Sequence, residues 1–157
     1  MKILIATDGS TFSETAVEKI CQMVTDTANA EVKIVSAYEQ PIMVAAAPYA
    51  IPAGYNPVFE EEMKGLATQA VSQAEGKIRE RFPDLKENLT TRILCGSPEQ
   101  AIVEEAENWG ADLIVVGSHG YGFWERTLLG SVSNAIVNHA PCSVLVVRKS
   151  RHDKGSQ

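Results

Sequence analysis

Cysteine is scarce in this sequence of 157 residues: three are present, and none forms a Cys-x-x-Cys pair with another. Cys21, Cys95 and Cys142 lie within or at the ends of apolar segments. We therefore expect reduced thiols in the core, rather than metal ligands or nucleophiles.

Long apolar runs are also missing. The apolar run that follows Lys2 has only four residues, too few for the core of a signal peptide. The longest apolar stretch, 42–53, is interrupted by Pro48 and Pro52. We therefore expect a cytoplasmic protein with no membrane partner.

Basic residues are in the minority, with 14 Lys and Arg against 20 Asp and Glu and a net charge of −6. Four of the basic residues lie from Arg148 onward, so the body of the chain is more acidic than the total. An acidic body disfavours DNA and RNA, and no nucleic-acid partner is expected. We expect residues 1–149 to form one domain and 150–157 to form a flexible basic tail.

Several catalytic motifs are absent from the sequence. There is no Gly-x-x-x-x-Gly-Lys-Ser/Thr loop, no Gly-x-Ser-x-Gly elbow and no early Gly-x-Gly-x-x-Gly, which disfavours P-loop enzymes, α/β-hydrolases and NAD or FAD enzymes. His119, His139 and His152 lack metal-ligand spacing to any cysteine.

Apolar strands and amphipathic helices alternate along the chain. The predicted strands are residues 2–6, 30–37, 89–95, 113–116 and 143–147, and the predicted helices are 11–27, 58–82, 98–109 and 131–139. In helix 58–82, Leu66 and Ala70 are expected on the buried stripe. The alternation predicts a parallel sheet covered by helices on both faces, with a crevice between the first and fourth strands.

Capping residues mark two of the helix starts. Thr11 with Glu14 has the spacing of a capping box. Ser97 is the expected N-cap before Pro98, with Gln100 completing a second box.

A glycine-rich loop follows the fourth strand. Gly117 and Gly120 come where the strand becomes a loop, and Gly130 with Ser131 follows after nine intervening residues. Ser131 is the expected N-cap of the next helix, whose first N–H groups and positive dipole end favour an anion. The segment predicts a phosphate cradle, although any one of these glycines could equally be an ordinary turn residue.

Asp8 lies at the carboxyl end of the first strand, where open α/β sheets bind ligands. By position alone, a turn-forming role and a ligand contact are equally supported.

The glycine spacing resembles the nucleotide-binding motif of the universal stress protein family, in its ATP-binding subgroup. Residues 2–10 (KILIATDGS) and 141–148 (PCSVLVVR) resemble that family's first and last strands. The resemblance implies a doubly wound, Rossmann-like parallel sheet with strand order 3-2-1-4-5. It also implies a homodimer formed by antiparallel pairing of the last strands.

The resemblance implies a site that binds ATP. Its expected residues are Thr7, Asp8, Ala37, Gly117, His119, Gly120, Gly130, Ser131, Val132 and Ser133. Ala37, His119 and Val132 are expected to act through their main chain. The hydroxyls of Ser131 and Ser133 are expected to assist the phosphates, and magnesium could join there. Asp8 is expected at the ribose or the adenine edge.

The favoured function is an ATP-holding regulatory module of the stress response. A slow ATPase or nucleotidyl-transfer enzyme using the same site stays open, and so does a preference for cyclic AMP. No general base is evident, and Arg126 is the only arginine near the glycine loop. The proline-rich segment 40–57 is expected to form a mobile cover near the base.

Overall fold

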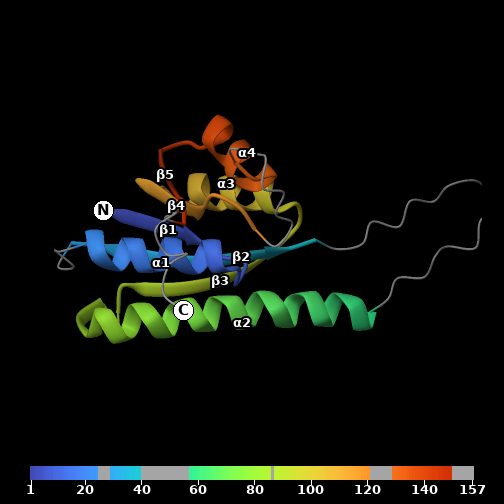
Figure 1. Ribbon diagram of the computed structural model, residues 1–157, viewed down its shortest axis with the longest axis horizontal. Helices are drawn as coiled ribbons and strands as arrows, with labels where there is room; N and C mark the ends of the chain where they lie inside the picture. The colour runs from blue at the N-terminus through green and yellow to red at the C-terminus, as the bar shows by residue number, and fades with distance from the viewer. Residues whose placement is uncertain (25–28, 40–56, 86, 121–128, 150–157) are drawn as a thin grey trace, which may run out of the picture.

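The computed structural model describes residues 1–24, 29–39, 57–85, 87–120 and 129–149, in which strands and helices alternate (Figure 1). The strands are β1 (Lys2–Ala6), β2 (Glu31–Tyr38), β3 (Leu89–Cys95), β4 (Leu113–Gly117) and β5 (Ser143–Val147). The helices are α1 (Thr11–Met23), α2 (Pro57–Arg81), α3 (Pro98–Trp109) and α4 (Ser131–His139), with the short 3-10 helix η1 (Pro83–Leu85) after α2. Arg126, the tail 150–157 and the expected cover, apart from Pro57, lie outside the described residues.

The five strands form one parallel sheet in the order β3-β2-β1-β4-β5, which confirms the predicted fold. Ile5 of β1 pairs with Ile34 of β2 on one side and with Val115 of β4 on the other. The direction of winding therefore changes between β1 and β4, and a crevice forms at the carboxyl ends of strands at such a point.

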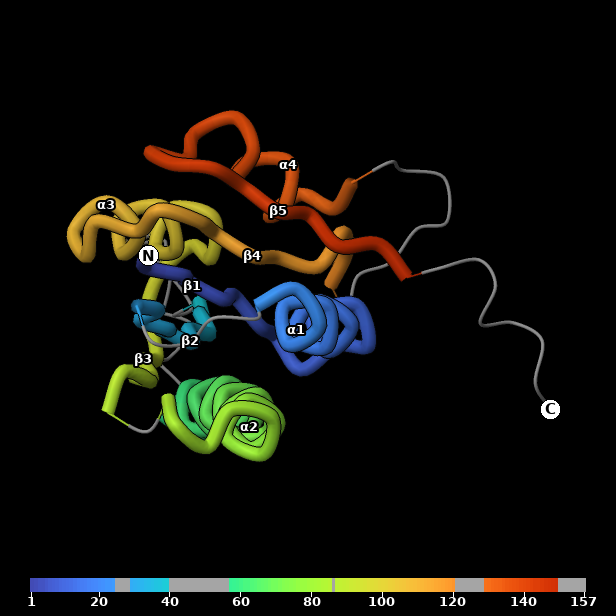
Figure 2. Tube along the Cα trace, turned by 90° about the vertical axis from the view of Figure 1, so that its left-hand side faces the viewer, coloured from blue at the N-terminus to red at the C-terminus, as the bar shows by residue number. Residues whose placement is uncertain are grey.

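Helices cover both faces of the sheet, as Figure 2 shows, with α1 and α2 opposite α3 and α4. Ile3 and Ile5 point to the α1 and α2 side, whereas Leu4 points to the α3 and α4 side. All three are fully buried, because successive side chains of a strand alternate between faces and both faces are covered.

The helix starts differ from the predicted caps. Ser10, not Thr11, is the N-cap of α1, and its side chain accepts from the Ser13 N–H. Ser97 is the N-cap of α3, but its side chain makes no capping hydrogen bond. It hydrogen-bonds to Glu99 instead, and this lowers the pKa of that carboxyl.

The N-cap of α4 is Gly130, and Ser131 is already helical, so the prediction of Ser131 as the cap is wrong by one residue. The reason lies in packing. A Cβ on Gly130 would lie 3.3 Å from the His119 Cα and 3.4 Å from the Ser118 oxygen, so a residue without a side chain suits this close approach.

The longest helix, α2, buries a narrow stripe of mainly small residues. The buried residues are Ala67, Ala70, Val71, Ala74 and Ile78. Leu66 was expected on this stripe but is 58% exposed, because successive helical residues are about 100° apart and it lies one position to the side. Among the helices that the structure describes, none is long and apolar enough to cross a membrane.

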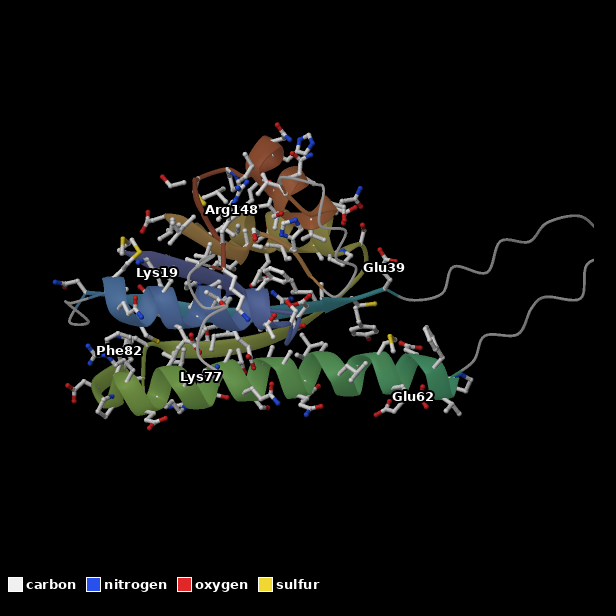
Figure 3. All side chains as sticks on the ribbon, viewed as in Figure 1. Lys19, Glu39, Glu62, Lys77, Phe82 and Arg148 are labelled. Carbon is white, nitrogen blue, oxygen red and sulfur yellow. The ribbon has the colours of Figure 1, made fainter. Side chains whose placement is uncertain are left out.

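Exposed ion pairs also link α2 to α1. The Lys77 Nζ lies 3.3 Å from a Glu18 carboxylate oxygen and 3.9 Å from one of Glu14. Figure 3 labels Lys77 on α2, the helix that lies beside α1. Exposed pairs contribute little, about 0 to 1 kcal/mol, so these two helices are held mainly by their buried residues.

The three cysteines are unpaired, but only two are partly buried. Burial raises the pKa of the Cys21 and Cys142 thiols above the ordinary value. The expectation of a core thiol is wrong for Cys95, which is exposed at the end of the edge strand β3.

Candidate functional site

A cavity of about 500 Å³ lies where β1, β2 and β4 end and where α1, α3 and α4 begin. All of the predicted site residues line it, from Thr7 to Ser133. Six further lining residues were not predicted, namely Ala6, Ser13, Pro98, Ile102, Val116 and Leu129.

The unpredicted lining residues carry no chemical signature in the sequence. Ala6 and Val116 are ordinary strand residues, and Ile102 is an ordinary apolar helix residue. The one usable signal was Pro98, since a helix that follows a parallel strand begins at the carboxyl edge of the sheet. That rule places Pro98 at the correct edge without saying which strand it faces.

The turn after β1 is held by the buried Thr7 side chain. Thr7 is 6% exposed, and its N–H donates to the Val35 oxygen at 2.9 Å. Its hydroxyl donates to the Ser13 Oγ at 3.1 Å and accepts from the Gly9 N–H at 3.2 Å. Thr7 therefore lines the cavity while its side chain holds the first turn against the start of α1.

Asp8 forms the turn after β1 and also lines the cavity. Its Oδ1 accepts from the Ser10 N–H at 3.0 Å, which closes the turn. The same residue is exposed and lines the cavity, and its Oδ2 lies against Gly120. One oxygen thus shapes the turn, and the other stays on the side of the glycine loop.

Gly117 allows β4 to end directly against the start of α1. A Cβ on Gly117 would lie 2.7 Å from the Phe12 carbonyl carbon and 2.8 Å from the Ser13 nitrogen. Real Cβ atoms do not approach backbone that closely, so this position requires glycine. Two residues further on, the His119 ring packs against the Phe12 ring, with the ring centroids 5.3 Å apart.

The peptide of Ser118 joins both ends of the glycine loop to the sheet. Its N–H donates to the Val147 oxygen of β5 at 2.8 Å. Its oxygen accepts from the Gly130 N–H at 2.7 Å and from the Ser133 hydroxyl at 2.9 Å. The Ser118 side chain is 2% exposed and lies 3.1 Å from the His119 Nδ1. Sequence reasoning missed this residue because its role depends on contacts distant in sequence.

Three backbone N–H groups at the start of α4 take no part in the hydrogen bonds of the helix. The first bond inside the helix runs from the Asn134 N–H to the Gly130 oxygen at 2.9 Å. The N–H groups of Ser131, Val132 and Ser133 therefore have no partner within the helix, and all three residues line the cavity. The Gly130 N–H and the Ser133 hydroxyl already donate to the Ser118 oxygen, so neither is a spare donor in the cavity.

The charge of the site comes from few groups. Among the lining residues that the structure describes, Asp8 is the only acidic residue, and none is Lys or Arg. The start of α4 adds a partial positive charge of about half a unit. In the described part of the chain, no group of three or more His, Cys, Asp or Glu side chains could hold a metal ion.

The sheet order and this cavity define a doubly wound α/β protein with a cavity at its switch point, into which the start of α4 opens. The chain belongs to the universal stress protein family, whose sequence pattern matches residues 1–148.

Relatives and solved structures agree with this assignment. A Staphylococcus aureus (strain USA300) protein of the same family name is 34% identical over 148 residues, which covers 93% of this chain and 82% of that one. The solved structure of protein MJ0577, a universal stress protein of Methanocaldococcus jannaschii, has a TM-score of 0.66 and 25% identity, covering 96% of both chains.

A universal stress protein solved in complex with cyclic AMP has a TM-score of 0.62 and 25% identity, covering 96% of this chain and 98% of that one. This chain spans only 37 to 38% of the length of the first Staphylococcus and Coxiella relatives that it matches.

Proposed function

We propose that this protein is a regulatory module of the stress response that binds an adenine nucleotide, ATP, without turning it over efficiently. The observation that carries the proposal is the cavity itself. It joins three N–H groups at the start of α4, which have no partner within the helix, to an apolar end formed by Ala37, Ile102 and Val116. A nucleotide has the same polarity, with anionic phosphates at one end and a flat base at the other.

The phosphates are assigned to the start of α4. The N–H groups of Ser131 to Ser133 and the helix dipole favour a negative charge there. The exposed Ser131 hydroxyl adds a donor at the same helix start. Magnesium, when bound, would neutralise phosphate charge. It would be held mainly by the phosphates, with the Ser131 hydroxyl as the protein ligand.

The base is assigned to the end of β2. Successive residues of a strand direct their N–H and C=O groups to opposite sides, and the Val35 oxygen accepts from Thr7 on the β1 side. Ala37, two residues on, directs its groups to that same side, where β1 has ended at Ala6. A neighbouring N–H and C=O pair matches the acceptor N1 and the donor N6 of adenine. It does not match guanine, which presents a donor at N1 and an acceptor at O6.

The ribose is assigned to Asp8. A carboxylate accepts well from sugar hydroxyls but repels phosphate oxygens. We therefore assign the ribose to Asp8 and the phosphates to the start of α4.

Cyclic AMP is the second candidate ligand, because a solved structure with 25% identity contains it and a single phosphate fits the same donors.

Two further properties belong to the proposal. The three unpaired thiols favour a reducing compartment, and we assign the protein to the cytoplasm. The backbone of β5 lies at the sheet edge, and we assign a homodimer to antiparallel pairing of two such strands.

The test begins with mass spectrometry of ligand retained by the protein purified from cells. Titration calorimetry then compares ATP, cyclic AMP and GTP on the wild type and on Gly130→Val. The new side chain must displace His119 or Ser118, so we expect ATP affinity to fall at least tenfold. Gly65→Val is the matched control, because a Cβ there meets nothing within 4 Å. Unchanged ATP affinity in Gly130→Val would remove this loop from the site.

A further inference from the structure

One face of α3 runs from the cavity to an ion-pair cluster around a buried glutamate. Pro98, Ile102, Glu105 and Trp109 are spaced four, three and four residues apart, which places them on one stripe of the helix. Pro98 and Ile102 line the cavity, whereas Glu105 and Trp109 lie further from it along the helix. Figure 2 shows α3 on the sheet face opposite α1 and α2.

Glu105 is a buried carboxylate with both oxygens paired. Its side chain is 5% exposed, and its Oε1 accepts from the Lys33 Nζ of β2 at 2.8 Å. Its Oε2 accepts from the Arg92 Nη1 of β3. The Lys33 Nζ also lies 4.5 Å from the centroid of the Trp109 ring, at the far end of the same stripe. The cluster therefore ties α3 to two strands at once.

The cluster and the base end of the cavity use the same two elements. Lys33 and Ala37 lie on one face of β2, since side chains two and four residues apart share a face. β2 runs toward the cavity and α3 runs away from it, so Ala37 and Ile102 form the cavity end while Lys33 and Glu105 form the buried end. Any shift of α3 over β2 at the ion pair also moves Ile102 relative to Ala37.

Buried ion pairs are a poor source of stability, because desolvation of the charges offsets their attraction and apolar replacements are often at least as stable. What a doubly paired carboxylate does supply is a defined position, through directional bonds of fixed length. We infer that Glu105 is a positioning residue that sets the slot between Ala37 and Ile102 for a flat base, and so controls affinity for the base but not for the phosphates. This inference rests on the proposed nucleotide site.

The experiment separates base binding from phosphate binding. Affinities for ATP, adenosine and inorganic tripolyphosphate are measured by calorimetry on the wild type, Glu105→Gln, Arg92→Gln and the double variant Lys33→Met/Glu105→Met. We expect Glu105→Gln to lose about tenfold in ATP and adenosine affinity, with tripolyphosphate unchanged. Arg92 is 61% exposed, so Arg92→Gln keeps the fold, and we expect a loss of about threefold for adenosine.

The double methionine variant tests positioning against stability. It removes both charges and keeps apolar volume, so we expect its melting temperature to match or exceed that of the wild type while adenosine affinity stays low. Arg79→Gln is the matched control, because it breaks the Arg79 to Glu75 pair on α2, away from α3. We expect it to leave all three affinities unchanged.

Wild-type adenosine affinity in a stable double methionine variant would overturn the inference, as would equal losses for adenosine and tripolyphosphate in Glu105→Gln. If the double variant does not fold, Arg92→Gln decides: unchanged adenosine affinity overturns the inference, and a selective loss supports it. A wild type that binds neither ATP nor adenosine would instead overturn the proposed function, and the inference with it.

Discussion

Asp8 and Gly120 lie against each other in the cavity lining, so closely that a Cβ on Gly120 would lie 2.6 Å from the Asp8 Oδ2. The first strand's turn and the glycine loop meet at this contact. The absence of a side chain at Gly120 leaves the carboxylate in its position, so the ribose contact proposed for Asp8 should depend on both residues together.

Asp8→Ala should lower ATP affinity by roughly tenfold or more, the cost of about one charged hydrogen bond. Calorimetry measures the affinity, and thermal unfolding checks the fold. Asp8→Asn is the control, because it keeps an oxygen that can accept from the Ser10 N–H while removing the charge. Unchanged ATP affinity with a lower melting temperature in Asp8→Ala would leave Asp8 as a turn former only.

Gly120→Ala extends the same test. In the wild-type background, we expect the new Cβ to push the carboxylate aside and lower ATP affinity. In the Asp8→Ala background it meets no carboxylate, so the further loss should be smaller. Strictly additive losses would show that the contact plays no part in binding.

Gly117→Ala should destabilise the fold. The added Cβ would lie within 2.8 Å of the Phe12 and Ser13 backbone, which no rotamer change can relieve. We expect a loss of about 2 kcal/mol, or a melting temperature lower by about 4 to 8 °C. Gly65→Ala, in an open helical position, should raise stability by roughly 0.5 to 1 kcal/mol. Equal melting temperatures for the two variants would contradict the close approach.

Val146→Pro should convert the expected homodimer to a monomer without unfolding it. The Val147 oxygen accepts from Ser118 on the β4 side, so the N–H of Val146 points to the open edge of β5. Proline there removes an edge donor only, whereas Leu145→Pro removes a donor to β4 and should lower stability. Light scattering gives the masses, and a monomeric wild type at high concentration, with or without ATP, would refute the dimer.

ATP turnover should be well below about 1 per second, the lower end for ordinary kinases. Phosphoryl transfer depends on charge neutralisation and a positioned water, and the described residues that line the cavity include no Lys or Arg. A phosphate-release assay with saturating ATP and magnesium makes the measurement. Turnover at or above that rate would favour the enzyme hypothesis.

The sequence alone determined the strand and helix order, the parallel sheet and the group of residues around the cavity. Apolar runs, helical periodicity and glycine spacing are local signals, so they can be recognised without knowledge of the fold. The resemblance to the family supplied the strand order and the main-chain positions Ala37, His119 and Val132, which no local signal marks. Asp8 could be placed at the correct edge because every parallel strand ends there.

Only the tertiary structure decided which hydrogen bonds and contacts each of those residues makes. Ser118 holds both ends of the glycine loop, Gly130 caps α4, and Ser133 donates inward, because each depends on a partner from a distant part of the chain. Packing likewise decided that Leu66 is exposed and that Ile102 lines the cavity. A pattern of residue types sets which face is apolar, but the positions of neighbouring elements decide what that face touches.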